Sequence, residues 1–503
     1  MKSISRREFL KIAALLGAGS SIVSSCAPLA SYLSGSEPNF LDPHLGRDEG
    51  WRMLNRLSFG PRLEDRQYLN EIGPENFLEE QLAPEAISDP RTEILLSRFD
   101  ILKMDADGLR NRADKLFDNY EPALVVDDFR QATILRQVYS KRQLEEVMVE
   151  FWTDHFNISV QKGDCWFLKI VDDREVIRKH ALGNFRELLR ASAHSPAMLV
   201  YLDNQENHKD APNENFAREL LELHTLGVNG GYNQEDVMEL ARCLTGWGVK
   251  DHFWRGELKF EPDAHAPGSK QVLGQTIPSI GRGEIDLVID LLSEHPATAR
   301  TISTKLARRF LADDPHPEII AKASQAFLDA QGDIKSVLRV ILLDGLSDAI
   351  HERYPLKYKR PVNFVVSALR LSGADTDGGE AIQRYLQQMG QSPYDWPTPD
   401  GYPDTASPWQ GNLLPRWRFA LDLVENRIKG TKFDLDRFLE GIAPGQADLF
   451  IDRAAKHFLG MSFPAEIELE LLHTLDRTIQ DRPRLAAQIV ISSLLASPAF
   501  QWR

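Results

Sequence analysis

Helical periodicity dominates the pattern of apolar and polar positions along this chain, and alternating runs typical of strands are few. Apolar residues recur every three or four positions in eight stretches, and the last one opens on a proline, which suits the first turn of a helix. The pattern predicts a mainly α fold: one large multi-helix body with long loops and little β structure. The stretches are 131–156, 173–191, 213–226, 235–244, 297–311, 334–343, 362–371 and 483–496.

Long loops are expected at 204–212, 254–274 and 391–413, where the helical pattern stops. No repeat of fixed period is present, and no clear linker follows residue 48. We therefore expect a signal segment (1–25), a tether rich in Ser, Pro, Gly and Asp (26–48), a helical main domain (49–430) and C-terminal helices packed on or beside it (431–503).

The first 25 residues have the features of an export signal. Arg6 and Arg7 precede Phe9 and an apolar run at 12–23, and this run is shorter than the roughly 20 residues that span a bilayer. The paired arginines resemble the twin-arginine (Tat) export signal of bacteria. The alternative is a chance arginine pair at a cytosolic terminus.

The segment Val23-Ser24-Ser25-Cys26 resembles a lipobox, in which the cysteine is acylated and becomes the first residue of the mature chain. Acylation at Cys26 would anchor the protein through lipid chains on the periplasmic or cell-surface face of a membrane, without a spanning helix. A secreted protein cleaved nearby is the alternative. The sequence does not distinguish the inner from the outer membrane.

Composition and charge exclude several classes of protein. The 503 residues hold 59 Lys and Arg against 74 Asp and Glu, a formal charge of −15, whereas general nucleic-acid binders are usually basic. Removing residues 1–25, which contain four basic residues and one acidic residue, changes the charge to −18. Three cysteines exclude a disulfide-built scaffold, and after Cys26 only Cys165 and Cys243 remain to form one disulfide.

Six segments together resemble the domain-of-unknown-function 1800 family, whose members are bacterial and frequently Tat-exported. This resemblance runs from about Trp51 to the C-terminus and carries no established activity. Genes of that family often neighbour those of a second Tat-exported family that looks like sulfatases and phosphatases, which implies a co-exported partner of that kind. The segments are 54–61 (LNRLSFGP), 151–156 (FWTDHF), 212–227 (PNENFARELLELHTLG), 295–299 (HPATA), 357–361 (KYKRP) and 497–500 (SPAF).

One segment departs from the family pattern. The family often has a His-Asp pair before Gly-x-Lys, whereas this chain has Ala266 after His265 and before Gly268 and Lys270. A role that needs a carboxylate directly after His265 is therefore in doubt.

Two histidines fall on the apolar faces of predicted helices. On a helical wheel His155 lies between Phe151 and Met148, and His224 falls within the apolar arc of the stretch 213–226. A buried imidazole needs a hydrogen-bond partner, so each histidine is either a satisfied core residue or part of a metal or acid–base site. The spacing matches no common metal motif, so metal is a weakly supported cofactor and others are unknown.

The polar face of the stretch 213–226 offers candidate catalytic residues. Arg218 is spaced for ion pairs with Glu214 and Glu222, and this face is either solvated or lines a polar cleft beside the loop 204–212 that suits an anionic or sugar ligand. The candidate catalytic set is Glu214, Arg218, Glu219, Glu222 and His224, and the candidate metal pair is His155 and His224.

The loop 391–413 carries five prolines among aromatic residues. Trp396, Tyr402 and Trp409 are candidate ligand-binding residues because aromatic rings offer flat apolar faces to sugars or aliphatic chains. A packed loop without a ligand is the alternative. The basic run 357–360 is interpreted as a charge cluster at a helix start, with an anion-binding patch as the alternative.

No nucleophile elbow, P-loop, dinucleotide fingerprint or HExxH motif is present, so serine-hydrolase, NTPase and NAD-enzyme functions have no support. The sequence leads to two hypotheses. The first is a Tat-exported, lipid-anchored α-helical enzyme or enzyme component with a His/Glu/Arg polar or metal site. The second is a non-enzymatic lipoprotein scaffold that binds a polysaccharide or a co-exported partner protein.

Overall fold

The computed structural model describes residues 49–115, 122–250, 256–346, 356–443, 446–463, 465, 468–473 and 482–503. Helices make up most of this part, and its strands form three short two-stranded antiparallel sheets, which confirms the mainly α prediction. No helix among these residues is both long and apolar enough to span a membrane. Arg6, Arg7 and Cys26 lie outside the described residues, so the export and lipidation predictions are untested.

The chain divides into two compact units. Unit 1 contains the residues up to Phe77 together with Leu346–Gly390 and Thr405–Arg503, and unit 2 contains Leu78–Gly345 and Gln391–Asp404. Each unit is therefore built from segments that are distant in sequence. The expected boundary at residue 430 falls within unit 1, and the division into 49–430 and 431–503 stays a prediction.

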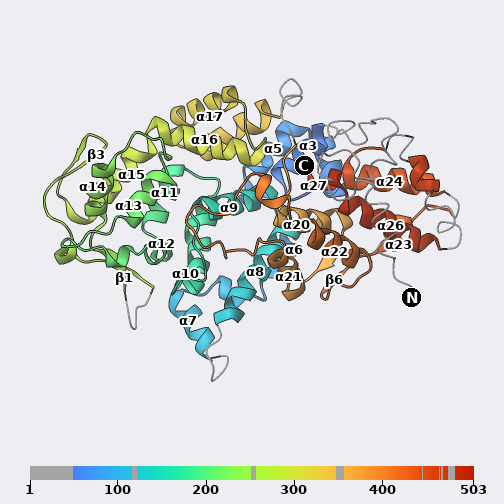
Figure 1. Cartoon of the computed structure of the whole chain (residues 1–503), viewed down its shortest axis with the longest axis horizontal. Coiled ribbons are helices and arrows are strands. Elements are labelled where there is room, and N and C mark those ends of the chain that lie inside the picture. Colours follow the sequence, from blue (N-terminus) through green and yellow to red (C-terminus); the bar gives the residue numbers. More distant parts are fainter. Residues whose placement is uncertain are drawn as a thin grey trace. The chain divides into compact units, whose positions relative to one another are not determined.

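Unit 2 is a series of helices with two small hairpins, and Figure 1 shows its helices α16 and α17 side by side. In the hairpin β3–β4 the connecting residues Leu273 and Gly274 both have positive φ, as a tight turn between paired strands requires. The elements of unit 2 are α6 (Pro90–Leu96), α7 (Ala106–Lys115), α8 (Pro122–Tyr139), α9 (Gln143–His155), α10 (Cys165–Asp172), α11 (Phe185–Ala193), α12 (Pro196–Tyr201), α13 (Asn215–Glu222), α14 (Gln234–Leu244), β1 (Trp247–Val249), β2 (Leu258–Phe260), β3 (Lys270–Val272), β4 (Gln275–Ile277), α15 (Glu284–Ser293), α16 (Pro296–Phe310), α17 (Pro317–Asp329) and α18 (Ile334–Arg339).

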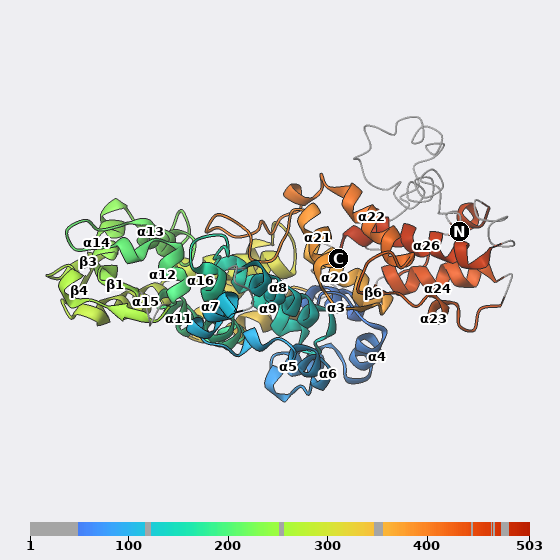
Figure 2. The ribbon, with the colours of Figure 1, turned by 90° about the horizontal axis from the view of Figure 1, so that it is seen from below.

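Unit 1 is also helical, and α24 and α26 lie side by side in both Figure 1 and Figure 2. In its described residues a short sheet pairs Asp375 with Lys432 and Thr376 with Thr431. Helix α5 (Pro74–Gln81) runs from the last residues of the first segment of unit 1 into unit 2. The remaining elements are α3 (Glu49–Leu57), α4 (Leu63–Ile72), α20 (Pro361–Ser372), β5 (Asp375–Thr376), α21 (Glu380–Gln388), α22 (Leu413–Val424), β6 (Thr431–Lys432), α23 (Leu435–Leu439), α24 (Ala447–Leu459), α26 (Pro483–Ala496) and α27 (Pro498–Gln501).

Two helices begin with the same His-Pro signal. The side chain of His295 accepts a hydrogen bond from the Ala297 amide at 3.1 Å, and His316 accepts one from the Glu318 amide at 3.3 Å. The proline that follows each histidine suits the first helical position because its missing N–H would have no partner there. The segment 295–299 therefore has a structural role as the start of α16.

Several predicted stretches have different limits in the structure. The stretch 131–156 is two helices, α8 and α9, and the Ser140 hydroxyl between them accepts a hydrogen bond from the Arg142 amide at 3.0 Å. The stretch 213–226 is helical only as α13, so His224 lies in the turn that follows it. The expected loop 254–274 contains β2 and β3, which are too short for a periodic pattern to reveal.

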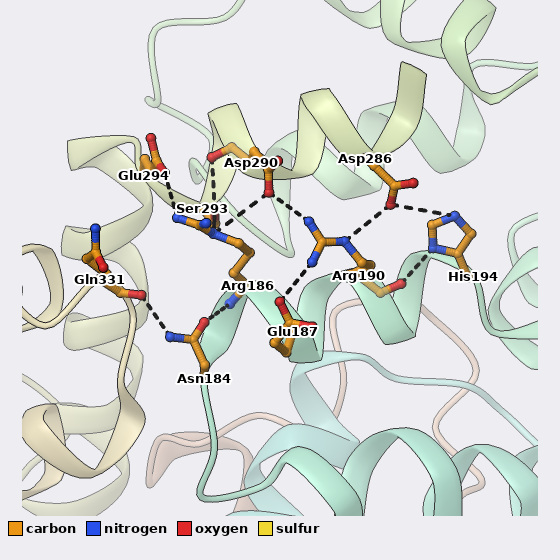
Figure 3. A network of polar contacts seen from close by, with 10 residues as sticks. All are labelled: Asn184, Arg186, Glu187, Arg190, His194, Asp286, Asp290, Ser293, Glu294 and Gln331. Atoms are coloured by element: carbon orange, nitrogen blue, oxygen red, sulfur yellow. Dashed lines mark hydrogen bonds and ion pairs between the residues drawn. The ribbon is translucent and has the colours of Figure 1, made fainter. Parts of the chain in front are cut away.

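A network of ion pairs joins α11 to α15 (Figure 3). Arg190 of α11 lies 2.7 Å from Asp290 and 3.2 Å from Asp286, and Arg186 forms an ion pair with Glu294 at 2.5 Å. Apolar residues on the other faces of both helices are buried, so the network lies at the edge of a hydrophobic contact. Because these side chains are partly exposed, each pair is worth only about 0.2–1 kcal/mol.

In unit 1 the family-like segments 54–61 and 357–361 bond to α20 and to the C-terminal residue Arg503. The backbones of Lys357 and Arg503 exchange two hydrogen bonds of 2.9 Å, and Arg370 donates to the Gly60 carbonyl oxygen at 2.7 Å. The basic run 357–360 directly precedes α20, as the sequence predicted, but Lys357, Lys359 and Arg360 are buried. The run pairs with the C-terminal segment, and the alternative of an anion-binding patch stays a prediction.

Candidate functional site

The two histidines singled out from the sequence meet in unit 2. His155 ends α9, His224 follows α13, and both side chains are buried, as predicted. Their ring centroids are 5.9 Å apart, and His155 Nε2 lies 3.1 Å from the carbonyl oxygen of His224. Because a carbonyl only accepts hydrogen bonds, Nε2 carries the proton and Nδ1 is left as an acceptor.

Lys305 of α16 provides the donor for His155 Nδ1. Its ammonium nitrogen Nζ lies 3.1 Å from Nδ1 and donates to the carbonyl oxygen of Leu223 at 2.9 Å. Sequence reasoning missed this lysine, since nothing in the periodicity of α16 distinguishes it from a lysine on a solvated face. Lys305 therefore connects α16 to the end of α9 and to the turn after α13.

The environment of Lys305 disfavours its charged form. Burial and the positive charge of Arg308 lower the pKa of Lys305 to about 8, although the negative charge of Asp400 opposes this shift. Among the described residues no carboxylate lies within ion-pair distance of Nζ, whose two contacts are with a carbonyl and a neutral imidazole. The residue as a whole is partly exposed, but its amine is buried and is held in place by these two contacts.

His224 is fully buried, and neither of its ring nitrogens has a hydrogen-bond partner among the described residues. Burial and the charge of Lys305 lower the pKa of His224 to about 3, and burial likewise holds the pKa of His155 well below 6.5. Both imidazoles are therefore neutral near pH 7. A buried imidazole without a hydrogen-bond partner is unusual in a protein core.

This arrangement does not support a metal ion bound by His155 and His224. Both nitrogens of His155 are engaged by protein groups, and Lys305 would bring a positive charge next to a bound cation. Across the described residues no three His, Cys, Asp or Glu side chains gather closely enough to hold a metal ion. We therefore base no function on a metal at this position.

The polar face of α13 differs in detail from the expectation. Arg218 contacts Glu214 at 2.9 Å and Gln234 at 3.1 Å, whereas Glu222 accepts a hydrogen bond from Tyr232 at 3.2 Å. Arg218 is thus oriented by one glutamate and an amide instead of by two glutamates. Tyr232 and Gln234 come from beyond the helix, so its own spacing could not reveal them.

Glu219 is the candidate carboxyl with the most unusual environment. It is partly buried, and burial together with the negative charge of Glu222 raises its pKa above the ordinary 4.5. Asp400 adds to this shift and also acts on Lys305. Glu219, Asp400 and Lys305 therefore influence one another electrostatically, although they come from α13, the loop 391–404 and α16.

The loop 391–404 is held close to the end of α9. Asn157 donates to the carbonyl oxygens of Trp396 at 3.0 Å and Thr398 at 2.7 Å, and the Trp396 indole donates to Asp400 at 2.9 Å. These contacts fix the carboxylate of Asp400, which also accepts from the Thr398 hydroxyl at 2.5 Å. The loop thus places a carboxylate in the neighbourhood of Lys305.

The three candidate aromatic residues are divided between the two units. Trp396 and Tyr402 belong to unit 2, with ring centroids 4.9 Å apart, whereas Trp409 belongs to unit 1 and is buried. Tyr402 is also buried, and its hydroxyl donates to the Ser392 carbonyl oxygen at 2.6 Å. These contacts are those of a packed loop, and the ligand role of all three aromatic residues stays a prediction; Trp396 is partly exposed.

The loop 204–212 lines a pocket of about 480 Å³, but not with the polar face of α13. Its opposite wall is formed by residues 260–264. Asn213 and Asn215 instead hold backbone: Asn213 donates to Asp203 at 3.4 Å and Asn215 donates to Leu202 at 3.2 Å. These amides fix the chain, and the polar cleft beside the α13 stripe stays a prediction.

At His265, where the sequence departs from the family pattern, a carboxylate is supplied from elsewhere in the chain. His265 Nε2 lies 3.1 Å from a carboxylate oxygen of Glu284, and the buried Lys270 ammonium lies 2.6 Å from the same oxygen. A carboxylate is thus beside His265 although Ala266 follows it in sequence. The cluster is closed off, since Glu284 and Lys270 have no exposed side-chain surface.

The two cysteines of the described chain are not paired. Cys165 and Cys243 are both buried free thiols. Burial raises the pKa of each thiol to about 12, so neither is a reactive thiolate near neutral pH. The structure therefore lacks the disulfide that the sequence allowed.

A family model matches nearly the whole chain. No curated protein and no solved structure matches the chain. The model described as a protein of unknown function (DUF1800) matches residues 52–502, which include segments of both units and every segment of the resemblance. The chain therefore belongs to the DUF1800 family.

Proposed function

We propose that this protein is an extracytoplasmic enzyme or enzyme component whose reactive group is the amine of Lys305. The observation that carries the proposal is the position of Nζ, 3.1 Å from His155 Nδ1 and 2.9 Å from the Leu223 carbonyl oxygen. Among the described residues no carboxylate lies at ion-pair distance from Nζ to favour its charged form. The contacts of Lys305 instead tolerate its neutral form.

The chemical consequence is a usable amine near physiological pH. With a pKa of about 8, roughly half of the Lys305 side chains are neutral at pH 8, whereas a lysine with an ordinary pKa near 10.4 is less than about 1 % neutral. A neutral amine can act as a general base or as a nucleophile. The nitrogen of the amine has three positions that are not bonded to carbon; two of them face Leu223 and His155, which leaves one for a ligand.

Two carboxyl groups complete the proposed site. Glu219, whose pKa is raised, is suited to donate a proton, and Asp400 is held as an acceptor by Trp396 and Thr398. In this proposal Glu214, Arg218 and Glu222 shape the polar surface beside Glu219. His224 borders the site through its contact with the ring of His155.

Competitive labelling with acetic anhydride across pH 6–11 tests the reactive amine. We expect Lys305 to become reactive with a midpoint near pH 8, and the exposed Lys322 to serve as the ordinary reference in the same sample. Peptide mass spectrometry reads both sites. A midpoint above pH 10 for Lys305 would overturn the proposal and would leave the scaffold hypothesis, in which the chain binds a polysaccharide or a sulfatase- or phosphatase-like partner.

We further propose that the protein is exported by the Tat route and anchored through Cys26. The basis is the sequence: the arginine pair Arg6–Arg7, the short apolar run and the lipobox-like segment before Cys26. Cys26→Ser should release the protein from membranes, and replacement of both arginines by lysine should stop its export. Membrane fractionation checks the first change; unchanged association of Cys26→Ser would refute the anchor.

A further inference from the structure

Lys305 has a second cation beside it on α16. Arg308 follows three residues later, on the same side of the helix, and its Nε donates to the Asp313 carbonyl oxygen at 2.9 Å. Within the described part of the chain neither side chain has a carboxylate at ion-pair distance. In a protein with a formal charge of −15, two neighbouring cations without carboxylate partners favour a negatively charged ligand.

The pair also has the physical features of an activated nucleophile. A lysine next to another cation, and removed from bulk water, keeps more of its amine in the neutral form. Lys305 meets both conditions, while its contacts with Leu223 and His155 fix the direction of Nζ. Arg308 is partly exposed, and its Nε is the nitrogen that bonds to the Asp313 carbonyl oxygen.

We propose that Lys305 forms a Schiff base with the carbonyl group of a small oxo acid, and that Arg308 binds the carboxylate of that acid. This inference rests on the proposed function, because it requires the reactive amine of Lys305. A guanidinium binds a carboxylate through two parallel hydrogen bonds, which would orient the carbonyl carbon relative to Nζ.

The step is balanced without an oxidant or a reductant. The lone pair of Nζ attacks the carbonyl carbon, and the C=O electron pair moves to the oxygen, which takes a proton. The nitrogen loses its protons to solvent water, the hydroxyl leaves as water after a second protonation, and a C=N bond forms. His155 holds Nζ in position and is a positioning residue here, since its low pKa makes it a poor base.

Reductive trapping of the full chain tests the inference. The probes are glyoxylate, which carries a carboxylate, and glycolaldehyde, a neutral aldehyde of similar size, each with sodium cyanoborohydride at pH 7.5. Peptide mass spectrometry measures the secondary amine formed at each lysine. We expect glyoxylate to modify Lys305 at least about tenfold faster than the exposed Lys322. Arg308→Gln should remove most of that advantage and slow glycolaldehyde trapping to a smaller extent, because loss of the Arg308 charge also raises the pKa of Lys305.

Each outcome decides the question. Equal rates at Lys305 and Lys322, or an equal loss of both probes in Arg308→Gln, would overturn the inference. Arg308→Lys, which keeps the charge, should retain part of the preference for glyoxylate, and circular dichroism confirms that each variant is folded. If Lys305 shows a labelling midpoint near pH 8 but no preferential trapping, the Schiff base is wrong and the reactive amine stands; a midpoint above pH 10 overturns both.

Discussion

Gly401→Ala should destabilise unit 2 by disturbing the contact between the loop 391–404 and the end of α9. Gly401 has a φ of +72°, and a Cβ at this position would overlap the backbone carbonyl oxygen of Asp154. The left-handed conformation costs alanine about 1–2 kcal/mol. Because a backbone carbonyl cannot rotate away as a flexible side chain can, crowding adds about 1–3 kcal/mol. The expected total is about 2–5 kcal/mol.

A second glycine separates strain from crowding. Gly274 has a φ of +73°, but a Cβ there would meet nothing within 4 Å, so Gly274→Ala should cost only the strain of about 1–2 kcal/mol. Thermal unfolding followed by far-UV circular dichroism measures both variants. At about 2 °C per kcal/mol for a unit of this size, we expect Tm to fall by roughly 4–10 °C for Gly401→Ala and roughly 2–4 °C for Gly274→Ala.

The same variant also reports on the site. The charge of Asp400 raises the pKa of Lys305, so a loop displaced by Gly401→Ala should lower that pKa further and shift the labelling midpoint below pH 8. Equal falls in Tm for the two glycine variants, with an unchanged labelling midpoint, would refute the reasoning. The loop would then not be held against Asp154, and Asp400 would not act on Lys305.

Three further predictions concern stability. At His224 the unfolded chain binds more protons than the folded chain, so the free energy of unfolding should fall as the pH drops from 6.5 toward 3. The fall is up to about 1.4 kcal/mol per pH unit for this group. His224→Gln should flatten that slope in urea unfolding, and an unchanged slope would contradict the assignment. Arg370→Met should lower the free energy of unfolding by about 3 kcal/mol or more, because it removes a buried guanidinium from Gly60 and Asp65. Arg384→Met, at an exposed ion pair, should lower it by less than about 0.5 kcal/mol in the same urea titration. A double-mutant cycle on Arg190 and Asp290 should give a coupling of about 0.5–1 kcal/mol that weakens in 1 M salt, and a salt-independent value would count against an ion pair.

Local periodicity was sufficient to predict the helical fold class and the burial of His155 and His224. It reports which face of a helix is apolar, and an apolar face is buried whatever covers it. It was less reliable at breaks: the stretch 131–156 became two helices because the polar contact between Ser140 and Arg142 lies inside an otherwise continuous pattern. His224 is buried although α13 ends before it.

The partners of these histidines could not be read from the sequence. Lys305 is 150 residues from His155, and Glu284, which replaces the missing carboxylate beside His265, comes from another helix. Periodicity contains no information on which element covers a given face, so only the folded chain could bring these groups together.

The sequence by itself determined the family, the helical class and two inward-facing histidines, because each depends on the order of residues within a short segment. The tertiary structure decided that Trp396 and Trp409 belong to different units and that Arg218 pairs with Gln234. It also decided that a lysine with a lowered pKa lies against His155. These facts depend on contacts between distant segments, and burial and electrostatics act through such contacts.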